Sequence, residues 1–148
     1  MRFAPLALIA LFAAGCGPSA HLRTFNYQIA NNLNEPITIF LTKSGPPLEP
    51  GWLAPEQLAA APLSEDSAHH DGKVVPPKTQ LTSTATGKFV DGSDAIVRIY
   101  RLTGGIDDFA AISPGSPKRA DVPLQRSDNS FVVSADDDYE MTVKRVTP

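Results

Sequence analysis

Two kinds of metal-ligating side chain, histidine and aspartate, gather in one short stretch of the sequence. Asp66, His69, His70 and Asp71 lie within six residues, and imidazole nitrogens and carboxylate oxygens are both ligands for zinc. Adjacent histidines point to opposite sides of an extended backbone, however, and zinc motifs normally place several residues between neighbouring ligands. The stretch therefore predicts a solvated polar loop, in which His69, His70 and Asp71 are weak metal candidates, and we expect no cofactor.

Carboxylates also cluster at two other places, at Asp136-Asp137-Asp138 and at the pair Asp91 and Asp94. Carboxylate oxygens are the ligands that calcium prefers. Neither place has the alternating aspartates, the glycine and the distal glutamate of a calcium-binding loop. We therefore expect polar turns, and the first cluster is expected to close the last hairpin of the chain.

Residues that nucleophilic enzymes require are scarce. Cys16 is the only cysteine, the chain has three histidines, and it contains neither a G-x-S-x-G elbow nor an H-E-x-x-H helix. Scattered carboxylates such as Glu56, Glu65 and Asp107 could meet in space as a hydrolytic pair, but nothing in their spacing requires this. The sequence favours a non-enzymatic protein, and a hydrolase is the least favoured alternative.

Three other residues are candidates for a binding surface. Trp52, the only tryptophan, lies in a stretch rich in proline and glycine, where an exposed aromatic ring could stack on a sugar or anchor a partner. The favoured alternative is that Trp52 packs over the open end of the fold. Arg98 and Tyr100 form a second candidate patch, most simply a solvated sheet face with a contact between arginine and tyrosine.

The elements that must position these residues are mostly strands. Apolar and polar residues alternate over 25–29 and over 37–41, with an asparagine-rich turn between them, which predicts a hairpin. The strongest strand is expected at 95–100, with Arg98 and Tyr100 facing away from the core. Further strands are expected at 78–84, 87–90, 120–125, 130–135 and 139–146. Short helices are expected at 55–61, where Pro55 suits the first position, and at 106–112.

About seven short strands with one or two short helical inserts predict an all-β fold. We expect a single antiparallel β-sandwich of immunoglobulin-like or transthyretin-like form. The Cys-Trp-Cys signature of true immunoglobulin domains is missing, because the chain has a single cysteine. A small, partly closed barrel is the alternative.

The leading residues have the layout of an export signal. Arg2 gives one positive charge, residues 3–14 are apolar apart from Pro5, and small residues precede Cys16. A membrane-spanning helix needs roughly 20 apolar residues, so this segment is too short to span a bilayer. We expect it to be removed.

The run Ala13-Ala14-Gly15-Cys16 resembles the signal of bacterial lipoproteins. The resemblance implies cleavage between Gly15 and Cys16 and acylation of Cys16, so that residues 1–15 are the signal peptide and 16–21 a lipidated spacer. An ordinary secretory signal is the alternative, but it would leave one free thiol in an oxidising compartment. We expect an exported protein anchored through acylated Cys16 to the cell envelope. Gly17 is compatible with the outer rather than the inner membrane.

The rest of the chain, 22–148, has the size of one domain. Without Arg2 it carries 12 basic and 16 acidic residues, a net charge of −4. A nucleic-acid-binding protein needs a clustered basic face, so this balance argues against a nucleic-acid partner.

A second, local resemblance concerns residues 95–102 followed by Asp107-Asp108-Phe109-Ala110-Ala111. They resemble the strand-plus-helix region of the outer-membrane lipoprotein of type VI secretion systems, itself a transthyretin-like sandwich. The segment covers under a fifth of the chain, and residues 22–92 do not follow that family's order. We carry over no function, and we expect a non-enzymatic role, in binding an envelope protein or supporting an assembly, with carbohydrate binding at Trp52 as the alternative.

Overall fold

The computed structural model describes residues 19–60 and 72–147. The expected cleavage and lipidation residues Gly15 and Cys16, and the weak metal candidates His69, His70 and Asp71, lie outside the described residues. Within the described part, no helix is long and apolar enough to cross a membrane.

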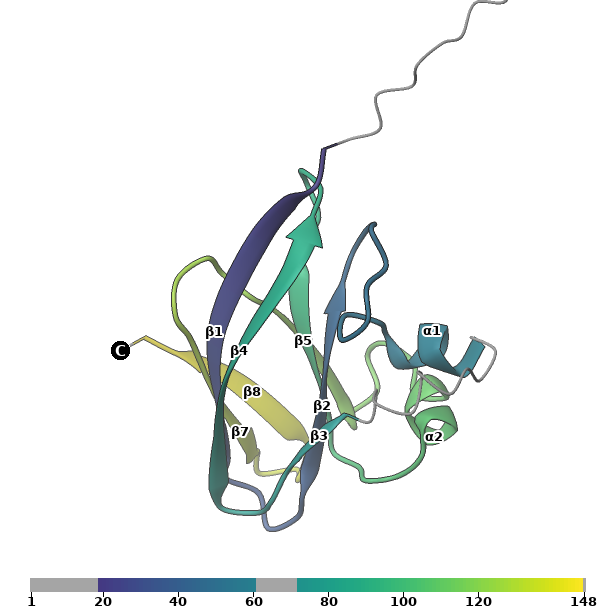
Figure 1. The fold of residues 1–148 in the computed structure, drawn as a ribbon. Helices are drawn as coiled ribbons and strands as arrows, with labels where there is room; N and C mark the ends of the chain where they lie inside the picture. The colour runs from purple at the N-terminus through teal and green to yellow at the C-terminus, as the bar shows by residue number, and fades with distance from the viewer. Residues whose placement is uncertain (1–18, 61–71, 148) are drawn as a thin grey trace, which may run out of the picture.

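The described residues form two sheets of four strands each (Figure 1). The first sheet has the order β4-β1-β7-β8 and consists of β1 (His21–Asn31), β4 (Thr79–Phe89), β7 (Asn129–Ala135) and β8 (Met141–Val146). The second has the order β3-β2-β5-β6 and consists of β2 (Ile37–Lys43), β3 (Lys73–Val75), β5 (Ala95–Tyr100) and β6 (Arg119–Pro123). The all-β prediction is confirmed. The expected helices are confirmed as α1 (Pro55–Ala60) and α2 (Ile106–Ala110).

One apolar cluster joins the two sheets. It takes Phe25 and Ile29 from β1, Phe131 from β7, and Ile39 and Val97 from the second sheet, all of them buried. These residues lie at every second position along their strands, and side chains of a strand point to opposite faces in turn. The alternating pattern therefore places one side of each sheet in a shared core.

The predicted hairpin between residues 25–29 and 37–41 is wrong. β1 pairs with β4 in antiparallel register and with β7 in parallel register, whereas β2 pairs with β3 and β5. The connection between β1 and β2 crosses from one sheet to the other, and the fully buried Asn31 holds it in place. Its side chain donates to the carbonyls of Glu35, at 2.9 Å, and Val75, at 3.0 Å.

Three further differences concern strand boundaries and direction. The strands expected at 78–84 and 87–90 are one continuous strand, β4, and residues 73–75 form an additional short one, β3. The pairing is not purely antiparallel, because β1 and β7 run parallel. A parallel pair joins strands that are far apart in the sequence, so no short turn in the sequence predicts it.

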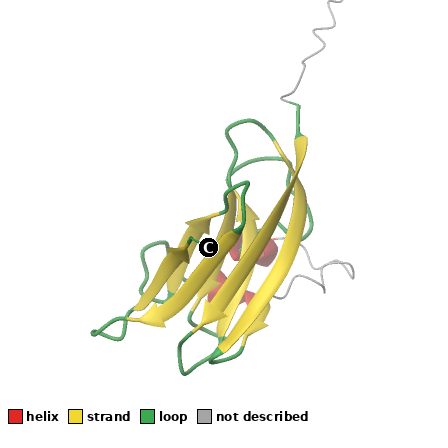
Figure 2. Ribbon diagram, turned by 90° about the vertical axis from the view of Figure 1, so that its left-hand side faces the viewer, coloured by secondary structure: helices red, strands yellow, loops and turns green. Residues whose placement is uncertain are grey.

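The two sheets differ in what covers their outer faces. Helices α1 and α2 lie next to each other against the outer side of the second sheet (Figures 1 and 2). Beneath them Phe40 of β2, Tyr100 of β5 and Phe109 of α2 form a second buried cluster. Among the described residues, no helix covers the outer face of the first sheet (Figure 2).

Candidate functional site

Trp52 belongs to the core. It is 3% exposed and packs edge-on against Phe25 and Phe89, with ring centroids 6.0 and 5.0 Å away. Its indole N–H donates to the carbonyl of Thr86 at 3.0 Å. No ring face is free to stack on a sugar, so the carbohydrate site expected as an alternative is not present at this residue.

Tyr100 is also not on the surface. The alternation correctly places it on the outer face of β5, but α2 covers that face, and Tyr100 is fully buried against Phe40 and Phe109. Its hydroxyl has no hydrogen-bond partner among the described residues, and burial raises its pKa. The expected exposed patch of Arg98 and Tyr100 is therefore wrong, because the short helix at 106–110 folds over it.

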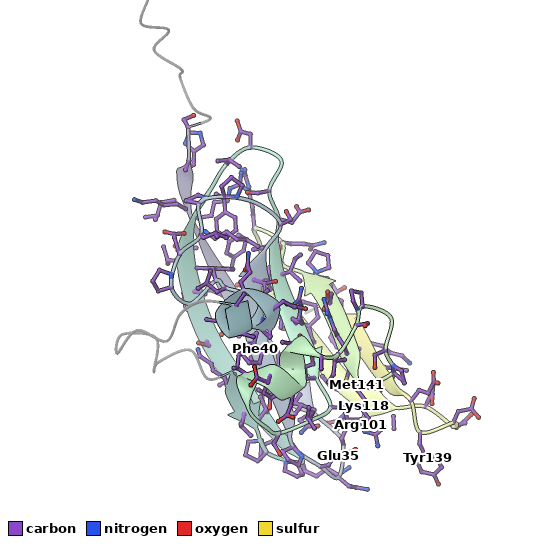
Figure 3. The ribbon with its side chains drawn as sticks, turned by 90° about the vertical axis from the view of Figure 1, so that its right-hand side faces the viewer. Glu35, Phe40, Arg101, Lys118, Tyr139 and Met141 are labelled. Carbon is purple, nitrogen blue, oxygen red and sulfur yellow. The ribbon has the colours of Figure 1, made fainter. Side chains whose placement is uncertain are left out.

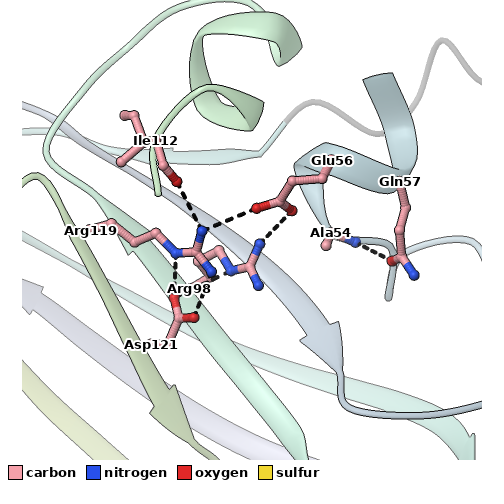
Figure 4. A network of polar contacts seen from close by, with 7 residues as sticks. All are labelled: Ala54, Glu56, Gln57, Arg98, Ile112, Arg119 and Asp121. Carbon is pink, nitrogen blue, oxygen red and sulfur yellow. Dashed lines mark hydrogen bonds and ion pairs between the residues drawn. The ribbon is translucent and has the colours of Figure 1, made fainter. Parts of the chain in front are cut away.

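Arg98 lies in a network of two arginines and two carboxylates (Figure 4). It binds Glu56 of α1 at 2.7 Å and lies 3.3 Å from Asp121 of β6. Arg119 holds Asp121 with two hydrogen bonds, of 3.0 and 2.8 Å, and also binds Glu56 at 3.1 Å and the carbonyl of Ile112 at 2.9 Å.

The charges of this network neutralise one another. Burial alone raises the pKa of Asp121, but the hydrogen bond from Arg119 and the charges of Arg98 and Arg119 outweigh burial and lower it below its usual value. Since Glu56 is held by both arginines, it is not a free acid or base of the kind a hydrolase needs. The network connects α1 and the residues that follow α2 to the second sheet.

The acidic cluster near the carboxyl end is a turn. The carboxylate of Asp136 accepts the backbone N–H groups of Asp138, at 3.0 Å, and of Glu140, at 2.8 Å. This confirms the expected hairpin turn between β7 and β8. Over residues 19–60 and 72–147, no three histidine, cysteine or acidic side chains come close enough together to hold a metal ion.

A depression of about 590 Å³ lies where four connections between strands and helices meet, and no pattern in the sequence indicates it. Its residues include Glu35 between β1 and β2, Arg101 after β5, Lys118 before β6, and Tyr139 between β7 and β8. The side chain of Arg101 donates to the Glu35 carboxylate and to the Tyr139 carbonyl. The arginine therefore ties together turns of both sheets (Figure 3).

Tyr139 is the most unusual residue of this depression. Its backbone has a φ of 62°, in the left-handed region, and its side chain is 78% exposed. A left-handed conformation costs a non-glycine residue about 1–2 kcal/mol. The turn built on Asp136 imposes this conformation, and the ring projects into solvent.

The depression lies at the end of the molecule opposite to the start of β1 (Figures 1 and 3). We call it the distal depression. No family model, curated protein or solved structure matches this chain.

Proposed function

We propose that this is a lipid-anchored cell-envelope protein with a non-enzymatic role, whose domain presents the distal depression to a protein partner. The supporting observation is that the depression and the start of β1 lie at opposite ends of the molecule (Figure 3). In this proposal residues 1–15 are the signal peptide, 16–21 the lipidated spacer and 22–148 one domain.

A short tether follows from where the first strand begins. β1 starts at His21, five residues after Cys16, and five extended residues span at most about 18 Å. An acylated Cys16 would hold that end of the domain close to the bilayer, with the outer membrane as the proposed location. The distal depression would then face away from the lipid.

The residues of the depression suit a protein surface. Arginine and tyrosine are enriched among residues that dominate binding energy. Tyr139 offers an exposed ring, while Arg101 is already fixed by Glu35 and by the Tyr139 carbonyl. Because Arg101 is held before binding, its place in an interface would cost little side-chain entropy.

The proposed domain type is a single β-sandwich of immunoglobulin-like or transthyretin-like form. Its support is the apolar cluster that takes buried residues from both sheets. The parallel pairing of β1 with β7 is the point at which it departs from a purely antiparallel sandwich.

The anchor is tested with Cys16→Ser in the native cell. We expect the wild-type protein to incorporate labelled fatty acid and to sediment with membranes, and the variant to do neither. Fatty-acid label retained on Cys16→Ser would contradict the proposed anchor.

The partner site is tested by placing a photo-crosslinking amino acid at Tyr139 in the full-length protein. A matched probe at Asp91, whose side chain is 88% exposed, serves as the control, because that residue lies outside the distal depression. We expect a discrete crosslinked product from position 139 and none of the same size from position 91. Identical products from both positions, or none from 139, would contradict a partner at the distal depression.

A further inference from the structure

β4 is an edge strand whose free side is only partly closed. It is 11 residues long, and the ladder of the first sheet pairs it with β1 alone. At its carboxyl end, three side chains close the free side. Trp52 donates to the Thr86 carbonyl, Lys43 donates to the Lys88 carbonyl at 2.8 Å, and Glu49 accepts the Lys88 N–H at 2.8 Å.

These contacts show which backbone groups of β4 point away from β1. Residues 86 and 88 use their free-side groups for the closing contacts, and backbone groups of a strand alternate sides with a period of two. The N–H and C=O groups of Gln80, Thr82 and Thr84 therefore point to the same free side. Among the described residues, no backbone or side-chain hydrogen bond reaches them. We call residues 79–85 the open half of β4.

The open half lacks the usual protection of an edge strand. Natural edges are blocked by proline, by charged side chains or by a bulge. Residues 79–87 contain no proline and no charged residue, and the register with β1 runs without a break from Asn31 opposite Thr79 to His21 opposite Phe89. The outward side chains Gln80, Thr82 and Thr84 are exposed and uncharged.

Three lysines lie on β4 or close to it in the sequence. Residues 72–90 contain Lys73, Lys78 and Lys88 and no acidic residue, although the whole chain has a net charge of −3. In the described structure none of these lysines forms an ion pair with an acidic side chain of the chain itself. The one carboxylate that closes the far end, Glu49, is bound by Lys43.

We infer that the open half of β4 binds an extended acidic segment of another protein, which adds a strand to the first sheet. The free N–H and C=O groups of Gln80, Thr82 and Thr84 offer up to six backbone hydrogen bonds to that strand, and the lysines attract its acidic side chains. Strand addition to a sheet edge is an established mode of peptide recognition. A second copy of this chain fits less well, because it would bring two positively charged edges together.

The test uses the full mature protein and two synthetic peptides of seven residues. Both have a core of alternating threonine and valine; one carries glutamate at each end and the other lysine. Backbone amide hydrogen exchange is measured by NMR with each peptide at millimolar concentration. We expect the glutamate peptide to slow exchange at Gln80, Thr82 and Thr84, and the lysine peptide to bind at least tenfold more weakly.

Two variants of the strand separate backbone pairing from side-chain contact. Thr82→Pro removes an N–H that β1 does not use, a change that edge strands tolerate on their free side, and we expect it to weaken binding of the glutamate peptide at least tenfold. Thr82→Val keeps the N–H and is the matched control, with binding within threefold of the wild type. The double variant K78E/K88E should reverse the preference between the two peptides.

Several outcomes would overturn the inference. They are unchanged exchange at Gln80, Thr82 and Thr84 in the wild-type protein, equal binding of both peptides, and a stable dimer that forms through β4 without peptide. The first result does not depend on any variant folding. Because this edge is separate from the distal depression, failure here leaves the crosslink at Tyr139 unaffected, and failure of that crosslink leaves this binding unaffected.

Discussion

The outer faces of the two sheets carry different residues and lie in different environments. On the second sheet, the outward residues Phe40 and Tyr100 are covered by α1 and α2 and are buried. On the first sheet, the outward side chains are exposed and form hydrogen bonds in pairs across strands: Thr84 donates to Asn26, and the hydroxyls of Thr24 and Thr86 bind each other, both at 2.9 Å. The outward residues therefore form a buried aromatic layer on the second sheet and a polar surface on the first.

This difference separates a face held by buried contacts from a face that is open to solvent. The covered face adds a second apolar cluster and the network of Arg98, Arg119, Glu56 and Asp121 (Figure 4). The first sheet has at its β4 side an edge that is free over half its length. Substitutions on the two outer faces should therefore affect different properties.

Phe109→Ala should give the largest effect. Phe109 is 3% exposed and packs on Phe40 and Tyr100 with centroid distances of 5.1 Å to each. Losing a buried phenylalanine typically lowers the free energy of unfolding by about 3–5 kcal/mol. Urea unfolding followed by tryptophan fluorescence measures this.

Thr84→Ala is the matched substitution on the uncovered face. Thr84 is exposed and its hydroxyl binds only Asn26, so the expected change is within about 0.5 kcal/mol. Equal losses for the two variants would show that the covered and uncovered faces do not differ in stability.

Arg119→Ala should cause the next largest loss in the free energy of unfolding. The Arg119 side chain is 3% exposed and holds Asp121, Glu56 and the Ile112 carbonyl. Leaving these acceptors without their donor should cost about 2 kcal/mol. Arg126→Ala, an exposed arginine outside the network, is the control and should leave unfolding unchanged.

Lowering the pH should reduce the contribution of Asp121 to the free energy of unfolding. Its pKa is lower in the folded protein than the usual value of 3.8, so the unfolded chain binds more protons as the pH falls. The contribution of this carboxylate to stability is complete above its usual pKa and is lost as the pH drops through the lowered value. Urea unfolding of the wild type and of Asp121→Asn is measured at each pH. The difference between their free energies of unfolding should shrink between pH 7 and pH 3.

Tyr100→Phe should change the free energy of unfolding least, and it is the one substitution here that is expected to raise it. The Tyr100 hydroxyl is buried and has no hydrogen-bond partner among the described residues. Removing an unpaired buried hydroxyl should leave stability unchanged or raise it by up to about 1 kcal/mol. A thermal unfolding scan checks this, and a loss of stability would show that the hydroxyl has a partner after all.

The local sequence determined the elements of this protein. Alternation of apolar and polar residues located β5 and the inward side of β1, Pro55 located the start of α1, and the acidic run at Asp136 located the last turn. Each of these depends on residues within a few positions of one another, which is the range over which side-chain period and turn chemistry act.

Only the tertiary structure decided how those elements meet. It paired β1 with β4 and β7 instead of β2, buried Trp52 and Tyr100, and brought Glu35, Arg101 and Tyr139 to one depression. These outcomes depend on contacts between residues that are tens of positions apart, such as Arg101 and Glu35. A strand pattern states which side chains face inward, but it does not state which strand lies alongside or what covers the other face.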